Sequence, residues 1–297
     1  MPSVPRSRRL IPALLAGAAA LLLAGCTAAP TGTAAGAFPT TGPGSDPVGR
    51  AALAVVHRAD RGYEGGRVVE DQAAEALTVV PRKSNGALVV FVHGWGQTRW
   101  ALLERRGEAD VSHALVAAGF TVLAADADLK AWGDPESVAD YKRLIAQEMR
   151  TRHLSRVFLM GESMGGLATM QLARELPAVR AVVAWYPVCD LRTMARPHYD
   201  QSIDEAWRGQ DRAAVSPVKV ADKPMMVWAS PQDTVVQASR NAALCVAEGR
   251  AAGAEVTYTH STGQHGDASN FAPETVVSFF ESHLTTAAQR PLQAAAQ

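Results

Sequence analysis

The chain has 297 residues, 47% of them hydrophobic and 20% charged, and its 29 basic side chains balance its 29 acidic ones. This composition is ordinary for a soluble globular protein, and the length allows one large domain or two small ones. Outside the N-terminus the sequence has no run or stripe of basic residues, so a nucleic-acid partner is not expected.

The first 25 residues have the layout of a bacterial export signal. Three arginines between residues 6 and 9 form a positively charged segment, and residues 10–24 form an apolar segment shorter than a typical membrane span. The apolar segment ends in Leu-Ala-Gly-Cys26, which resembles the lipobox of bacterial lipoproteins. The resemblance implies cleavage before Cys26 and a lipid on its sulfur, which would hold the mature chain at the outer face of the cell membrane. The alternative is an ordinary secretory cleavage site and a secreted product.

Cleavage before Cys26 would change both the charge and the layout of the chain. It would remove three arginines and no acids, and the remaining 26 basic and 29 acidic side chains make the mature chain slightly acidic. Residues 26–47 are rich in Thr, Ala, Gly and Pro, and we expect them to form a flexible tether. A folded domain is expected over residues 48–285, followed by a disordered tail at 286–297.

Apolar segments alternate with helical patterns through most of the predicted domain. Before residue 82 only a short helix at 51–57 and an edge strand at 76–80 are suggested. Further on, strands are expected at 87–92, 121–125, 156–160, 180–185, 225–229 and 255–259. Helices are expected near 108–118, 136–152, 164–176, 237–252 and 274–284. The alternation predicts an α/β fold with a mostly parallel central sheet and helices on both faces. The longest interruption, at 187–224, is interpreted as a small cap over the site.

The segment Gly161-Glu162-Ser163-Met164-Gly165-Gly166 joins a predicted strand to a predicted helix. Glycines two residues either side of Ser163 remove the Cβ atoms that would clash in so tight a turn. The turn would expose the hydroxyl group, and the helix N-terminus behind it favours developing negative charge. This G-x-S-x-G pattern, in its strand–turn–helix setting, predicts a nucleophilic serine. The alternative is a glycine-rich turn whose serine only caps a helix.

A serine nucleophile needs an adjacent base, and the base needs a group that orients it. Asp233 follows the predicted strand at 225–229, and His265 lies in a glycine-flanked loop after the strand at 255–259. The segment His93-Gly94-Trp95-Gly96 follows the strand at 87–92. Reactive groups of such a fold gather at the carboxyl ends of its strands, so we expect these segments to lie near Ser163.

With these residues in this order, the chain resembles an α/β-hydrolase of the serine esterase and peptidase type from about residue 50 to residue 285. The resemblance implies the α/β-hydrolase fold and a Ser-His-Asp triad. In that triad Ser163 is the nucleophile, His265 the general base and then acid, and Asp233 the carboxylate that holds the histidine tautomer.

The loop after the strand at 87–92 adds to the resemblance. His93-Gly94-Trp95-Gly96 resembles the H-G-x-G segment of the same superfamily. The resemblance implies that the backbone N–H groups of Trp95 and Met164 form the oxyanion hole, and it leaves His93 a structural role.

Each assignment has a rival. His260 is an alternative base, but it would end its strand and not lie in the loop. Asp190 is an alternative acid after the strand at 180–185, whereas Asp267 is interpreted as a turn-forming residue. The remaining histidines show no ligand-like clustering, and the sequence lacks H-E-x-x-H or paired C-x-x-C spacing, so neither a metal nor a cofactor is expected. Cys189 and Cys245 would lie where disulfides persist, and the sequence leaves open whether they form a bridge or two buried thiols.

The first functional hypothesis is an exported, membrane-tethered serine hydrolase that cleaves carboxylic esters through an acyl-enzyme. A peptidase is the main alternative, because Ser216-Pro217 and Asp233–Val236 resemble the catalytic domain of prolyl-oligopeptidase-like enzymes. An acyltransferase, in which an alcohol replaces water, is a third. A surface binding protein on a hydrolase scaffold is the non-enzyme alternative, because a fold alone does not fix function. The acyl group and the oligomeric state are not predicted.

Overall fold

The computed structural model describes residues 63, 65–129, 132–210, 216 and 218–285. The chain divides into two compact units, residues 1–45 and 46–297, and every described residue belongs to the second. The predicted export signal, Cys26, the tether, the helix at 51–57 and the C-terminal tail therefore lie outside the described residues. No helix among the described residues has both the length and the apolar character needed to cross a membrane.

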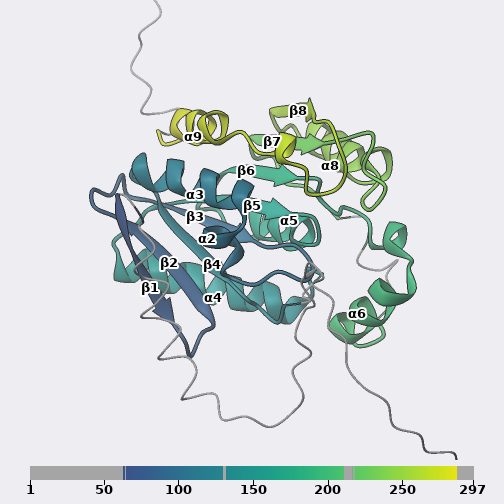
Figure 1. The fold of residues 1–297 in the computed structure, drawn as a ribbon, viewed down its shortest axis with the longest axis horizontal. Coiled ribbons are helices and arrows are strands. Elements are labelled where there is room, and N and C mark those ends of the chain that lie inside the picture. The colour runs from purple at the N-terminus through teal and green to yellow at the C-terminus, as the bar shows by residue number, and fades with distance from the viewer. Residues whose placement is uncertain (1–62, 64, 130–131, 211–215, 217, 286–297) are drawn as a thin grey trace, which may run out of the picture. The chain divides into compact units, whose positions relative to one another are not determined.

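A single sheet lies at the centre of the described unit (Figure 1), with the strand order β1-β2-β4-β3-β5-β6-β7-β8. β2 pairs antiparallel with both of its neighbours, whereas β4, β3, β5, β6, β7 and β8 run parallel to one another. The strands are β1 (Gly66–Asp71), β2 (Ala76–Pro81), β3 (Ala87–Val92), β4 (Thr121–Ala125), β5 (Arg156–Glu162), β6 (Val179–Trp185), β7 (Met225–Ala229) and β8 (Val256–His260).

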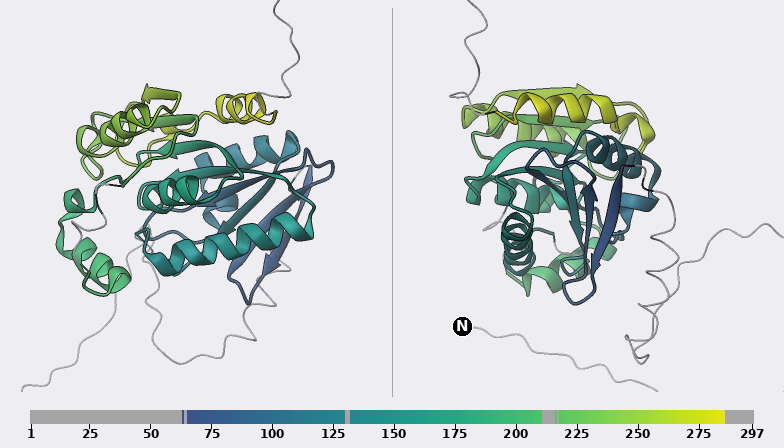
Figure 2. Two further views of the ribbon diagram at one scale, coloured as in Figure 1. Left: turned by 180° about the vertical axis from the view of Figure 1, so that it is seen from behind. Right: turned by 90° about the vertical axis from the view of Figure 1, so that its left-hand side faces the viewer.

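Helices cover both faces of the sheet (Figures 1 and 2). α3 and α9 share one buried apolar cluster with the sheet, and α4, α5 and α8 share the other. The α-helices are α2 (Ala101–Glu104), α3 (Arg106–Ala117), α4 (Pro135–Thr151), α5 (Gly165–Glu175), α6 (Pro197–Trp207), α8 (Ala242–Ala251) and α9 (Pro273–Ser282). Short 3-10 helices are η1 (Leu191–Met194), η2 (Ala238–Arg240) and η3 (Ala268–Asn270). The predicted α/β fold, with a mostly parallel sheet between two layers of helices, is confirmed.

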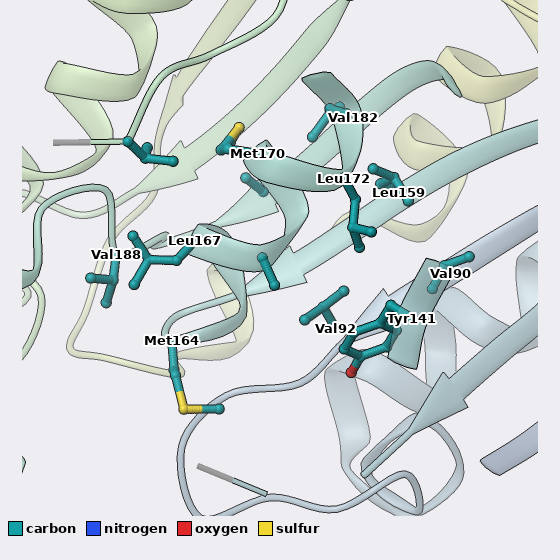
Figure 3. Packing of buried hydrophobic residues seen from close by; sticks show 14 of the residues in the cluster. Val90, Val92, Tyr141, Leu159, Met164, Leu167, Met170, Leu172, Val182 and Val188 are labelled. Atoms are coloured by element: carbon teal, nitrogen blue, oxygen red, sulfur yellow. The ribbon is translucent and has the colours of Figure 1, made fainter. Parts of the chain in front are cut away.

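The central strand β3 shows why its sequence is apolar throughout. All six of its side chains are buried, and successive residues point to opposite faces of the sheet. Val90 and Val92 belong to the cluster beneath α4 and α5, where Figure 3 shows them near Tyr141, whereas Val89 and Phe91 belong to the cluster beneath α3. A strand covered on both faces has no position at which a polar side chain would meet water.

Two expectations about the elements were wrong in detail, and one strand was not predicted. β2 is not an edge strand, because the unpredicted β1 pairs with its outer side. β1 has the half-buried, mixed sequence Gly-Arg-Val-Val-Glu-Asp, which lacks a continuous apolar signal. The helix expected at 237–252 is divided into η2 and α8 at Asn241. The side-chain oxygen of Asn241 accepts the backbone N–H groups of Cys189 and Asp190.

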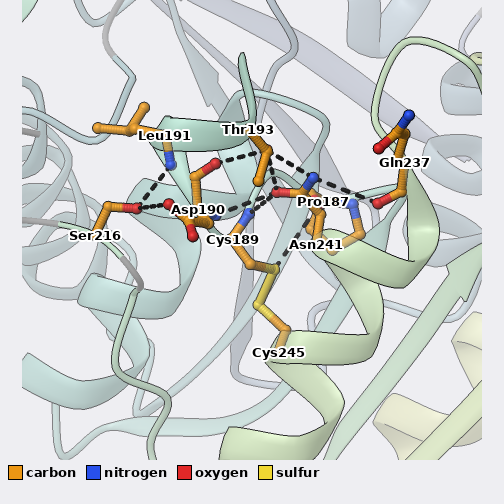
Figure 4. The surroundings of a disulfide bond; sticks show 9 residues. All are labelled: Pro187, Cys189, Asp190, Leu191, Thr193, Ser216, Gln237, Asn241 and Cys245. Atoms are coloured by element: carbon orange, nitrogen blue, oxygen red, sulfur yellow. Dashed lines mark hydrogen bonds between the residues drawn. A yellow bond between two sulfur atoms is a disulfide. The ribbon is translucent and has the colours of Figure 1, made fainter. Parts of the chain in front are cut away.

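The segment between β6 and β7 holds η1 and α6 and is fixed to the rest of the unit at its start. A disulfide joins Cys189 to Cys245 of α8, with the two Cα atoms 5.9 Å apart (Figure 4). Asp190 next to it pairs with Arg192 and accepts a hydrogen bond from Ser216 Oγ. The structure therefore contains the disulfide that the sequence could not decide. It links the start of the segment between β6 and β7 to α8.

Candidate active site

Ser163 occupies a strained turn between β5 and α5. Its φ angle is +51°, in the left-handed region that side chains other than glycine seldom adopt. The backbone of the turn is held on both sides: Ser163 N donates to Trp185 O at 3.0 Å, and Ser163 O accepts from Val188 N at 2.8 Å. Because neighbouring chain segments fix this conformation, the hydroxyl is held at the carboxyl end of β5.

The two glycines that flank the serine are required by their neighbours as well as by the turn. A Cβ at Gly161 would lie 2.2 Å from Thr169 Oγ1 of α5, and one at Gly165 would lie 2.2 Å from Val92 O at the end of β3. Both distances are far below any real carbon–oxygen contact. The elbow can therefore pack against its own helix and against β3 only with glycine at these positions.

Ser163, His265 and Asp233 form a continuous hydrogen-bonded chain. His265 Nε2 lies 3.0 Å from Ser163 Oγ, and His265 Nδ1 lies 2.7 Å from Asp233 Oδ2. The other carboxylate oxygen of Asp233 accepts the backbone N–H groups of Val235 and Val236 at 2.8 and 2.9 Å. The side chain of Asp233 is 2% exposed and that of His265 is 22% exposed. The carboxylate is thus fixed and buried, while the imidazole remains open to an incoming molecule.

The rival residues are engaged elsewhere. The ring of His260 lies against Tyr258, with the ring centroids 4.6 Å apart, and Asp190 pairs with Arg192. Asp267 caps η3 by accepting the backbone N–H of Ser269. Among the described contacts, His265 is the histidine that is bonded to Ser163 and Asp233 is the acid that is bonded to His265.

The loop after β3 lies against Ser163. A Cβ at Gly94 would be 3.4 Å from Ser163 Cβ, so the loop and the elbow are in close contact. Within the described residues, the backbone N–H groups of Trp95 and Met164 donate to no backbone or side-chain acceptor. Both ring nitrogens of His93 face backbone carbonyl oxygens, at 2.9 Å from Gly94 and 3.0 Å from Asp126, which ties this loop to the one after β4.

An aromatic cluster joins this loop to α6. The indole N–H groups of Trp95 and Trp132 both donate to Ser202 Oγ of α6, at 3.2 and 2.8 Å. Tyr199 packs edge-on against both indoles, with ring centroids 5.2 and 5.4 Å away. Trp95 is 39% exposed, so this cluster is not fully covered.

Sequence reasoning missed Tyr199 and Ser202 as neighbours of Trp95. Ser202 and Trp95 are 107 residues apart in the chain, and no local pattern connects them. No described group of three or more His, Cys, Asp or Glu side chains has an arrangement able to hold a metal ion.

A family model described as "Alpha/beta hydrolase family" matches residues 89–294. The chain belongs to the alpha/beta hydrolase family. The matched residues contain the elbow, the loop after β3 and the Ser163–His265–Asp233 chain of hydrogen bonds. No curated protein matches this alpha/beta hydrolase at a significant level of sequence similarity.

Solved structures with the same fold include several esterases. A truncated carbohydrate esterase from gut microbiota is 15% identical, with a TM-score of 0.58, over 73% of this chain and 93% of that chain. A carboxylesterase from Lactobacillus plantarum is 17% identical, with a TM-score of 0.54, over 74% and 98%. An acylaminoacyl peptidase from Pyrococcus horikoshii is 16% identical, with a TM-score of 0.55, but the match spans only 40% of its length. At such identities the likeness establishes the fold of this alpha/beta hydrolase and not its substrate.

Proposed function

We propose that this alpha/beta hydrolase is a serine hydrolase that cleaves carboxylic esters through an acyl-enzyme. The observation that carries the proposal is the hydrogen-bonded chain from Ser163 Oγ through His265 to Asp233, with distances of 3.0 and 2.7 Å. The esterases among the structural neighbours support an ester substrate.

In the first half of the reaction, His265 Nε2 accepts the hydroxyl proton while Ser163 Oγ bonds to the ester carbonyl carbon. The resulting tetrahedral intermediate expels the alcohol, which takes the proton from His265 as it leaves. Asp233 keeps Nδ1 protonated, so that Nε2 is the free base, and it stabilises the imidazolium ion that forms. In the second half, His265 removes a proton from water, the hydroxide attacks the acyl carbon, and the acid leaves as Ser163 regains its proton.

The oxyanion of each tetrahedral intermediate is assigned to the N–H groups of Trp95 and Met164. Their lack of other acceptors in the described structure supports this role. Met164 directly precedes α5, whose N-terminus favours negative charge at this point. Loss of one such donor typically costs about 3 kcal/mol of transition-state stabilisation.

Two experiments test the reaction. A fluorophosphonate probe should label the wild type and leave Ser163→Ala unlabelled, while Ser155→Ala, an exposed serine at the opposite end of β5, should be labelled normally. Equal labelling of wild type and Ser163→Ala would exclude Ser163 as the nucleophile. A panel of p-nitrophenyl esters and aminoacyl anilides then separates an esterase from a peptidase, which the acylaminoacyl peptidase neighbour keeps as the second candidate. Added alcohol acceptors test acyl transfer, and no turnover of any substrate would favour a binding protein.

We also propose that the chain is exported and carries a lipid on Cys26. The charged and apolar segments of residues 1–25 support export, as does the Cys189–Cys245 disulfide, because such bonds persist in oxidising compartments. Labelled palmitate should enter the wild type and not Cys26→Ser. Unchanged labelling of that variant would exclude the anchor, and secretion without labelling would favour ordinary cleavage.

A further inference from the structure

Directly behind the nucleophile lies a buried acid that the proposed mechanism does not use. Glu162 is the last residue of β5, and its side chain faces the same side of the sheet as Met160, which packs in the cluster beneath α3. The residue is 2% exposed. Its carboxyl group therefore lies inside the protein, between the elbow and the start of α3.

One oxygen of this carboxyl group receives two hydrogen bonds. Gln97 Nε2 and Tyr186 Oη each donate to Glu162 Oε1 at 2.7 Å. The second oxygen, Oε2, is equally buried and has no hydrogen-bond partner among the described residues. An ionised carboxylate would leave a charged, unpaired oxygen in the interior, whereas a proton on Oε2 removes that charge.

Gln97 connects Glu162 to the loop that carries the proposed oxyanion donor. Gln97 Oε1 accepts the backbone N–H of Gly94 at 3.0 Å, and Gln97 N donates to Gly94 O at 3.2 Å. Because a backbone N–H can only donate, the amide oxygen must face Gly94 and the amide nitrogen must face Glu162. The contact between Gln97 and Glu162 thus fixes the loop on either side of Trp95.

Tyr186 connects Glu162 to the proposed base. Its ring packs edge-on against the imidazole of His265, with the ring centroids 4.5 Å apart. Tyr186 is 1% exposed and has a φ angle of +36°, so its backbone is held in an unusual conformation. Its hydroxyl group is directed at Glu162 Oε1, and that bond fixes the ring beside His265.

Burial and the neighbouring Glu108 favour the neutral form of Glu162, and Arg105 opposes it. Glu108 of α3 is the acid that acts on Glu162, and Arg105 donates to Glu108 Oε1 at 2.7 Å while its charge also acts on Glu162. Burial raises the pKa of the Glu162 carboxyl to about 8, and the negative charge of Glu108 adds to the rise, while Tyr186 and Arg105 oppose it. His265 also faces this network, across the ring of Tyr186.

We propose that Glu162, as a neutral carboxylic acid, is a positioning residue that holds the loop of Trp95 and the imidazole of His265 in place around Ser163. This inference rests on the proposed function, because it assigns a role in the reaction of that serine. Ionisation of Glu162 puts a negative charge next to the place where the oxyanion forms, and it raises the energy of the transition state. The rate of the wild type should therefore fall at alkaline pH.

The test is the pH dependence of kcat and KM with a p-nitrophenyl ester. Wild type should lose activity as the pH rises through about 8. Glu162→Gln keeps an oxygen acceptor and carries no charge, so it should keep most of the neutral-pH rate and lose this alkaline fall. Glu162→Ala removes the acceptor and should lower kcat by roughly 10²-fold with little change in KM. Glu274→Gln, at an exposed acid of α9, should match the wild type throughout.

Two further variants should move the alkaline limb in opposite directions. Tyr186→Phe removes a donor that favours the ionised form, so the limb should move to higher pH. Glu108→Gln removes the adjacent negative charge, so the limb should move to lower pH. An unchanged alkaline limb in Glu162→Gln would overturn the role of Glu162 while leaving the serine hydrolase intact. Absence of both turnover and Ser163 labelling in the wild type would instead overturn the proposed function, and the role of Glu162 with it.

Discussion

The proton on Glu162 should be visible in the stability of the protein without any measurement of catalysis. The pKa of this carboxyl is raised from 4.5 to about 8, mainly by burial and then by Glu108. The folded state therefore binds the proton more tightly than the unfolded state, by about 3.5 pKa units or about 5 kcal/mol. Between these two pKa values the folded protein keeps the proton and the unfolded chain has released it.

The sign of the effect follows from that difference. Below pH 4.5 both states hold the proton, and the stability contribution of the neutral acid is fully present. As the pH rises, unfolding releases a proton, so the free energy of unfolding falls by about 1.4 kcal/mol per pH unit. The fall stops once the pH has passed about 8, where the folded state ionises too. Glu162→Gln has no proton to lose and should lack this part of the pH dependence.

Urea unfolding followed by tryptophan fluorescence measures the difference. Between pH 5 and pH 8, the free energy of unfolding of the wild type should fall by about 4 kcal/mol relative to that of Glu162→Gln. Titrating groups away from this network are common to both proteins and cancel in the comparison, whereas Glu108 and Tyr186 interact with Glu162 and belong to the effect measured. Glu274→Gln should run parallel to the wild type, because Glu274 is exposed. Parallel profiles for wild type and Glu162→Gln would refute a neutral, buried Glu162.

Three further predictions concern the rest of the site and its frame. Asp233→Asn should leave the fold intact and lower kcat, measured by steady-state kinetics, by about 10⁴-fold. The reason is that the amide no longer holds the productive tautomer of His265. Gly165→Ala should abolish fluorophosphonate labelling, because its Cβ would lie 2.2 Å from Val92 O. Gly253 has a φ of +90° and open space around it, so Gly253→Ala should lower the free energy of unfolding by about 1 kcal/mol and keep labelling. Replacing Cys189 and Cys245 together by serine should lower the free energy of unfolding by about 4 kcal/mol, since the bridge closes a loop between residues 56 apart in the chain. An unchanged urea midpoint in that double variant would contradict this estimate of loop closure.

The parts of the fold that could be predicted are those whose signal is local. β3 and β5 are apolar because both of their faces are covered, and the glycines around Ser163 mark a turn wherever it lies. β1 carried no such signal, because an edge strand with one open side and mixed polarity resembles a loop in sequence. The break at Asn241 was also hidden, since its side chain is used by residues about 50 positions earlier in the chain.

The network around Glu162 could not be predicted from its own segment. Glu162 reads as the variable position of a G-x-S-x-G pattern, and its partner Gln97 is 65 residues away. Nothing in the sequence distinguishes this acid from a solvated one. Only the packing of α3 against the sheet brings Glu108 alongside it and excludes water from both.

The register of the sheet explains how distant segments reach one place. Val92 is paired with Gly161 across β3 and β5, so the loop that begins at His93 must start beside Glu162. Glu162 is in turn paired with Trp185 across β5 and β6, so the next residue, Tyr186, must also start there. The ends of β3, β5 and β6 thus bring together the loop of Trp95, Ser163 and Tyr186. The Glu162 carboxyl lies where these segments meet and bonds to Gln97 and Tyr186. A shift of one residue in either pairing would turn that carboxyl to the opposite face of the sheet, away from Gln97 and Tyr186. The register of β5 with β3 and β6 is therefore what places an acid directly behind Ser163.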